Sequence, residues 1–227
     1  MRISPFAYAC FLLPCGVIVV CYLVSTHLGQ VAVCFPFYSG CASISAAARQ
    51  EPAIHIFRMV MLPMTTVFAG FWVVCRVWLL QWDIKRLQAN AVGILGVVGA
   101  VFLVLYVVFL GTEGRIYDLL RRFGTTVYFG CTGIAQLIVA VSLSEQRKRL
   151  PAFFGTMILP LFLFISVSML ILGIVYIPAA NFFTAHNVEN IIEWNFAFLM
   201  HINFALVWIL WRRQGLRLSL APGTSSP

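Results

Sequence analysis

Six long apolar runs constrain the fold of this chain more than any other feature of its sequence. They cover residues 6–25, 57–80, 92–110, 123–143, 153–177 and 191–211. Each run has about the 20 residues that a helix needs to cross a bilayer core roughly 30 Å thick. Helices are expected because lipid cannot satisfy the unpaired backbone groups of open strands. We therefore predict an all-α, six-helix transmembrane bundle, formed by a single membrane domain over residues 1–220 and followed by a disordered tail at 221–227.

The composition agrees with a membrane protein. Hydrophobic residues make up 62% of the chain and charged residues 10%, whereas a soluble domain carries about 25% charged residues. The first run starts close to Met1, as a signal peptide does, but it is long enough to span, so we expect a mature helix. The net charge of +8 suits the anionic lipids of a membrane surface, and we predict no nucleic-acid partner.

The basic residues predict the orientation of the spans. If both termini are cytoplasmic, ten Lys and Arg residues fall on the inner side and five on the outer side, which is the bias that the positive-inside rule expects. The five outer basic residues are Arg49, Arg58, Arg115, Arg121 and Arg122. Five of the seven acidic residues also fall on the outer side. The outer face is therefore neutral overall but dense in opposite charges.

The longest connection, residues 33–58, is expected to be a long ordered first outer loop. Long connections are usually functional or disordered, and this one is too apolar to stay solvated. Residues 43–50 predict a short helix on the membrane surface, for which Ser43 can serve as the N-cap. Cys34 and Cys41 both lie in this outer loop, on the side where the compartment is oxidising. Their spacing alone does not establish whether they form a disulfide or stay as two free thiols. We interpret the loop as the lid or floor of a site at one membrane face.

Small residues and prolines predict details of the packing. Gly93, Gly96 and Gly99 recur in the third run, and the fourth run has its own set of glycines at 124, 130 and 133. Because small residues let helices approach closely in lipid, these two spans are expected to form a tight hairpin. Pro63 and Pro160 fall early in their spans and are expected to kink them.

Polar residues gather where the sixth span begins. Glu189, Asn190, Glu193 and Trp194 open this span, and His201 lies near the face that the two glutamates share. Ionisable groups in a span usually face the bundle interior and are functional. Two interpretations stay open, and they are compatible. The carboxylates can pair with outer arginines as interface structure, or an arginine–carboxylate cluster can bind a phosphate head group.

The sequence contains no established catalytic or metal-binding pattern. Ser43 and Ser45 share the loop with His55, but no GxSxG motif surrounds either serine. The four histidines are scattered and show no HxxxH or HxxE spacing. We therefore assign no catalytic residue and predict no metal site and no cofactor.

The first loop and the entry to the second span resemble the Frag/DRAM/Sfk membrane protein family. The matching residues are Cys34, Pro36, Ser43, Ser45, Ala46, Pro52, Phe57, Arg58, Glu193 and Trp194. The family includes the post-GPI-attachment factor needed for fatty-acid remodelling of glycosylphosphatidylinositol (GPI) anchors, and its domain forms the N-terminal part of the yeast-type cell-wall biogenesis protein. The resemblance implies a six-span fold and a role in GPI-anchor remodelling or membrane lipid homeostasis, without implying a catalytic mechanism.

We therefore expect a multi-pass protein of the plasma or inner membrane, or of a secretory-pathway membrane, with a lipid head-group site on its outer face. The residues that we assign to this site are Ser43, Ser45, Arg49, Arg58, Glu113, Arg121, Glu189, Asn190, Glu193 and Trp194. The expected partner is a membrane lipid. The alternative is a non-catalytic regulator that binds a partner membrane protein.

The orientation can be tested with reporter fusions or cysteine accessibility. Positions Gln88, Gln146 and Gln214 should report the cytoplasmic side, and Gln50 and Asn187 the outer side, because the basic residues favour cytoplasmic termini. An outer signal at Gln146 would contradict the assignment.

Overall fold

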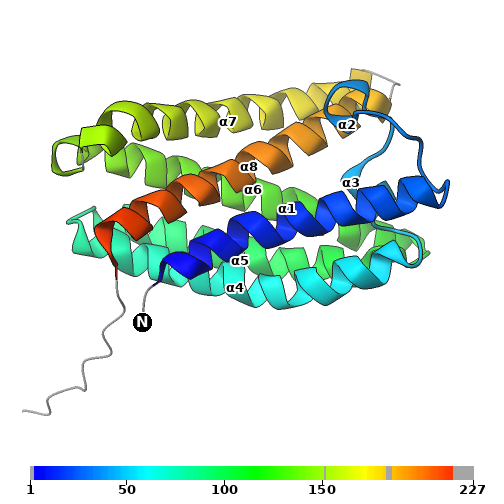
Figure 1. The fold of residues 1–227 in the computed structure, drawn as a ribbon, viewed down its shortest axis with the longest axis horizontal. Coiled ribbons are helices and arrows are strands. Elements are labelled where there is room, and N and C mark those ends of the chain that lie inside the picture. The colour runs from blue at the N-terminus through cyan, green and yellow to red at the C-terminus, as the bar shows by residue number, and fades with distance from the viewer. Residues whose placement is uncertain (1–2, 151, 183–185, 217–227) are drawn as a thin grey trace, which may run out of the picture.

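The computed structural model describes residues 3–150, 152–182 and 186–216, with the backbone alone at 176–182 and 186. These residues form helices and no strand, and six of the helices are long and apolar enough to cross a membrane. The long helices are α1 (Ser4–His27), α4 (Ala53–Gln81), α5 (Arg86–Phe109), α6 (Arg115–Glu145), α7 (Leu159–Phe182) and α8 (His186–Gln214). The chain is a multi-pass, all-α membrane protein, as predicted (Figure 1). The predicted tail at 221–227 lies outside the described residues.

Short helices occur in the connections. The first loop contains α2 (Pro36–Ser39) and α3 (Ile44–Ala47), and the connection from α6 to α7 contains the 3-10 turn η1 (Arg147–Arg149) and the π-helix η2 (Phe154–Ile158). The helix predicted over 43–50 is therefore shorter than expected. The π-helical turn lies directly before Pro160, which has no N–H to donate to the preceding turn.

The helices form a bundle in which most neighbours in sequence are neighbours in space. Helix α1 packs between α4 and α8, α5 packs between α4 and α6, and α7 packs against α6 and α8. The first and last described residues meet, because the Ile3 N–H donates to the Leu216 carbonyl at 3.3 Å. We call this the terminal end of the bundle, and the opposite end, which carries residues 28–52, the loop end (Figure 1). That the terminal end faces the cytoplasm stays a prediction.

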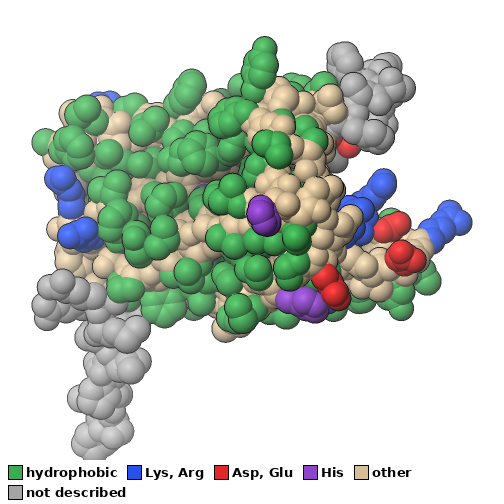
Figure 2. Space-filling view, turned by 45° about the vertical axis from the view of Figure 1, so that its right-hand side comes forward, with side chains coloured by type: hydrophobic (Ala, Val, Ile, Leu, Met, Phe, Trp, Pro, Cys, Tyr) green, Lys and Arg blue, Asp and Glu red, His purple; other side chains and the backbone are tan. Residues whose placement is uncertain are grey.

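The surface has the polarity of a membrane-spanning protein. Hydrophobic side chains cover the middle of the face in Figure 2, while basic side chains lie at the terminal end, and basic and acidic side chains lie together at the loop end. Helix α6 has 31 residues, which is about 46 Å of helix and longer than a bilayer core. Its first turns carry an ion pair between Asp118 and Arg121, whose side chains meet at 2.9 Å.

The predicted α5–α6 hairpin is present, but only some of the glycines form it. A Cβ on Gly124 would lie 2.8 Å from the Phe102 carbonyl oxygen and 2.9 Å from the Tyr106 nitrogen, so the two backbones touch there. Gly99 faces α6 as well, whereas Gly96 packs against Trp72 of α4. The glycines of α5 therefore serve two neighbouring helices.

Buried polar side chains also join the helices in the middle of the bundle. The Gln136 amide donates to the Met200 carbonyl at 2.9 Å, and the Asn203 amide donates to Gln136 Oε1 at 3.0 Å and to Ser166 Oγ at 3.2 Å. Such bonds hold helices together in lipid, where the alternative is an unsatisfied polar group. This network ties α6, α7 and α8 to one another.

The close approach of α5 and α6 can be tested with Gly124→Ala. The added methyl group would meet backbone atoms that cannot rotate away, so we expect a loss of about 1–3 kcal/mol in the free energy of unfolding. Gly130→Ala is the matched control on the same helix, because a Cβ there meets no atom within 4 Å. Thermal unfolding in detergent measures both, and an equal Tm for the two variants would contradict the packing.

Candidate functional site

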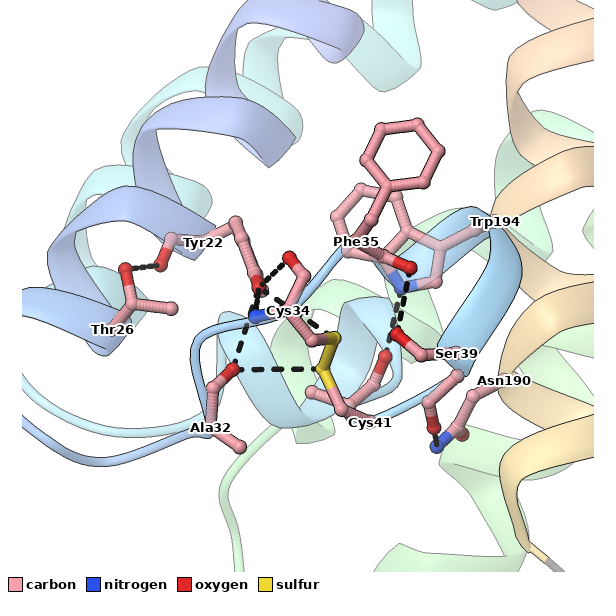
Figure 3. The surroundings of a disulfide bond; sticks show 11 residues. Tyr22, Thr26, Ala32, Cys34, Phe35, Ser39, Cys41, Asn190 and Trp194 are labelled. Carbon is pink, nitrogen blue, oxygen red and sulfur yellow. Dashed lines mark hydrogen bonds between the residues drawn. A yellow bond between two sulfur atoms is a disulfide. The ribbon is translucent and has the colours of Figure 1, made fainter.

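The first loop is fixed to α1 by side chains near the end of that helix. The Tyr22 hydroxyl donates to the Cys34 carbonyl at 2.7 Å and accepts the Cys34 N–H at 3.0 Å (Figure 3). The buried Ser25 hydroxyl donates to the Ala47 carbonyl at 2.7 Å. These bonds satisfy loop backbone groups that would otherwise be costly to bury.

Helix α8 holds the same loop from the other side through three side-chain donors. The donor–acceptor pairs are Asn190 Nδ2 to the Gly40 carbonyl (2.8 Å), Trp194 Nε1 to the Ala42 carbonyl (2.8 Å) and Asn195 Nδ2 to the Phe37 carbonyl (2.9 Å). The Trp194 ring also packs edge-on against Tyr22 and Phe37. The loop is thus an ordered part of the bundle, as the sequence predicted.

The two loop cysteines are joined. A disulfide links Cys34 and Cys41 and closes the segment that contains α2 (Figure 3). Gly40 ends α2 with a φ of +58°, a conformation that favours glycine. Ser43 caps α3 as predicted, because its hydroxyl accepts the Ala46 N–H at 2.9 Å, and it also lies 3.1 Å from the Ser45 hydroxyl.

A small cavity of about 30 Å³ lies under α3, enclosed by side chains of five of the six long helices. Its lining residues are Ile18, Ile44, Phe57, Met61, Leu103, Tyr106, Thr125, Tyr128, Phe129, Glu193, Ala197 and His201. Ile44 of α3 is the member from the first loop, which therefore covers the cavity as a lid. Glu193, Ala197 and His201 follow one another at intervals of four residues and present one face of α8 to it.

The cavity contains polar groups without partners among the described residues. His201 Nδ1 lies 2.6 Å from the Ala197 carbonyl, so Nδ1 carries the proton and Nε2 is an acceptor. His201 Nε2 and the Tyr128 hydroxyl are both buried and have no hydrogen-bond partner in the described part of the chain. The Glu193 carboxylate faces the backbone N–H groups of Ile44 and Ser45 at the start of α3. This arrangement gives the cavity an excess of hydrogen-bond acceptors.

Two arginines lie on the loop-end side of the cavity. Arg49 belongs to the first loop and is exposed, and Arg121 lies one turn of α6 nearer the loop end than the lining residue Thr125. Both act electrostatically on Tyr106, Arg49 also acts on Glu193, and the Arg121 guanidinium is bound to Asp118. That these groups form a head-group site stays a prediction.

Arg58 has a different environment from the one we expected. Its guanidinium donates to three carbonyls at the C-terminal end of α5: those of Val107 (3.3 Å), Val108 (2.9 Å) and Leu110 (2.7 Å). Within the described ranges it forms no ion pair with Glu193. A helix C-terminus attracts a cation because its last carbonyls lack intrahelical partners. Arg58 therefore ties α4 to α5.

The other predicted residues do not line the cavity. Asn190 and Trp194 support the loop, Glu113 is exposed in the turn between α5 and α6, and Glu189 is half-buried and acts electrostatically on Glu193. Sequence reasoning missed Asn195, Tyr106 and Tyr128. Asn195 has a sequence signal, because it is a polar amide next to Trp194 at the start of the sixth span. The tyrosines have no such signal, because the sequence of an apolar run does not mark which tyrosine faces inward.

The comparisons with known proteins add no relative. No protein-family model, no curated protein and no solved structure matches this chain. Among the described residues, no group of three His, Cys, Asp or Glu side chains could hold a metal ion. The site is an acceptor-rich cavity with arginines on its loop-end side.

The attachment of the lid can be tested with Trp194→Phe. This change keeps an aromatic ring but removes the donor to the Ala42 carbonyl, which leaves a buried acceptor unsatisfied at a cost of about 1–3 kcal/mol. Hydrogen exchange of residues 33–48 should then become faster. Trp208→Phe, at an aromatic contact with Tyr8, is the control and should leave exchange in the loop unchanged. Equal exchange in the two variants would count against the lid.

Proposed function

We propose that the loop end binds the phosphate of a membrane lipid head group. The observation that carries the proposal is that Arg49 of the first loop and Arg121 of α6 lie on the loop-end side of a cavity covered by an ordered loop, and that both act electrostatically on its lining residue Tyr106. A guanidinium donates two parallel hydrogen bonds to phosphate oxygens, which makes arginine well suited to this group. Glu193 and the Asp118 carboxylate that is bound to Arg121 offset the positive charge of the two guanidinium groups.

The membrane position supports a lipid as the ligand. The site lies at one end of six helices whose exposed side chains are apolar, where the head groups of a bilayer gather. The Cys34–Cys41 disulfide favours an oxidising compartment for the loop end. This agrees with the basic bias that predicts cytoplasmic termini. The protein would then face the outside of a plasma or inner membrane, or the lumen of a secretory-pathway membrane.

The resemblance of the first loop to the Frag/DRAM/Sfk family extends the proposal from binding to a biological role. On that resemblance, the protein acts in GPI-anchor remodelling or in membrane lipid homeostasis. The proposed contribution of this chain is recognition of the head group.

Arg49→Gln tests the proposal. Because a charge-assisted hydrogen bond contributes about 1.5–3 kcal/mol, we expect about a tenfold or greater loss of retained phospholipid per purified protein, with Arg49→Lys intermediate. Arg86→Gln is the matched control, since Arg86 is also exposed but lies at the terminal end. Mass spectrometry of lipids that remain after detergent purification provides the measurement.

Equal retention in Arg49→Gln and Arg86→Gln, at equal Tm, would remove the phosphate site. Recovery of one stoichiometric membrane protein in place of lipid would instead support the regulator that binds a protein partner.

A further inference from the structure

The loop-end side of the cavity and its interior have opposite chemical character. Arg49 belongs to the first loop and Arg121 lies on the loop-end side of the lining residue Thr125, whereas the interior contains the Glu193 carboxylate and the His201 Nε2 acceptor. Arg121 precedes the lining residue Thr125 by one helical turn, which is about 6 Å along α6. A ligand that contacts both the arginines and the interior acceptors therefore carries a negative group at the arginines. It also carries a positive or hydrogen-bond-donating group that lies a few ångströms deeper, inside the cavity.

Aromatic rings form much of the cavity wall. Phe57 and Tyr106 meet edge to face with their centroids 6.0 Å apart, and Tyr128 and Phe129 lie 5.4 Å apart. All four residues line the cavity. The negative face of an aromatic ring attracts a cation within about 6 Å of its centroid, most strongly when water is excluded.

We propose that this cavity receives the primary ammonium group of a phosphoethanolamine-type head group, whose phosphate binds at Arg49 and Arg121. The proposal rests on the function proposed above and specifies its ligand. A primary ammonium has three N–H donors. The cavity offers three acceptors for them: the Glu193 carboxylate, His201 Nε2 and the Tyr128 oxygen. Two of these atoms have no other partner among the described residues, and buried polar atoms in proteins are rarely left so.

Hydrogen bonding separates this group from its methylated relative. A trimethylammonium group carries three methyl groups in place of three hydrogens, so it cannot donate to the three acceptors. The cavity therefore selects ethanolamine over choline.

The test is a lipid competition with the full chain. The purified protein is exchanged into a mixture of phosphatidylethanolamine, phosphatidylcholine and phosphatidylglycerol with identical acyl chains, and the retained lipids are quantified. We expect phosphatidylethanolamine to be enriched about tenfold over phosphatidylcholine. Soluble phosphoethanolamine and phosphocholine, added as competitors, show whether the head group alone is sufficient or whether a lipid is required. Either result supports the ammonium site, provided that the ethanolamine compound is preferred.

Two variants inside the cavity locate this preference. Tyr128→Phe and Glu193→Gln should each reduce the enrichment of phosphatidylethanolamine toward parity while phosphatidylglycerol is still retained. Their controls are Tyr8→Phe, on a partly exposed ring that packs against Trp208, and Glu145→Gln, at the exposed terminal end of α6. Thermal unfolding checks that Glu193→Gln has not released α3 from the bundle. Tyr128→Phe is the second variant because the Tyr128 side chain has no hydrogen bond to the first loop among the described residues.

The outcomes distinguish the two proposals. Equal retention of ethanolamine and choline lipids, or a preference that neither cavity variant changes, overturns the ammonium site even if Arg49→Gln still abolishes lipid retention. Loss of all lipid retention in the unmodified protein overturns both proposals together.

Discussion

The loop end depends on one physical constraint, which is that the backbone of the first loop is buried against the bundle and must be hydrogen-bonded there. Residues 28–52 are too apolar to lie in water and too irregular to satisfy their own carbonyls. Side chains of α1 and α8 supply the missing donors, with Tyr22 and Ser25 on one side and Asn190, Trp194 and Asn195 on the other. The lid, the enclosed cavity and the position of Arg49 all follow from this docking.

The docking also explains the position of Glu193. The residue lies between two donors of the same helix, but it points to another face, where it meets the first N–H groups of α3 and the cavity. A carboxylate at the start of a helix is favourable because the first N–H groups lack intrahelical acceptors. One turn of α8 therefore has two roles. Asn190 and Trp194 bind the loop backbone, and Glu193 places a carboxylate beneath α3.

The sequence was sufficient to predict the spans, because a helix must be long and apolar to cross a bilayer. Segments of soluble proteins rarely combine that length with that apolar composition. It placed some helix ends less well. Helix α4 begins at Ala53, before its apolar run at 57–80, since hydropathy marks the lipid-facing part of a helix and backbone hydrogen bonding continues beyond it. Arg58 illustrates another limit. Its place near the loop end was predictable, but its partners are the backbone carbonyls of α5, which have no sequence signature. Tyr106 was missed because its all-apolar run has no periodicity to show which face is inside.

The peripheral position of helix α7 affects how fast its sequence can change during evolution. Its described side chains do not line the cavity, and it packs on the outside of α6 and α8. Among its described side chains, Leu159, Phe162, Ile165, Ser166 and Met169 are buried against the bundle, whereas residues such as Leu161, Phe164 and Ile171 are exposed. Substitutions among Leu, Ile, Val and Phe should therefore accumulate at the exposed positions almost freely. The inward faces of α6 and α8 should drift much more slowly, so that related chains would be recognised from those faces and from the first loop.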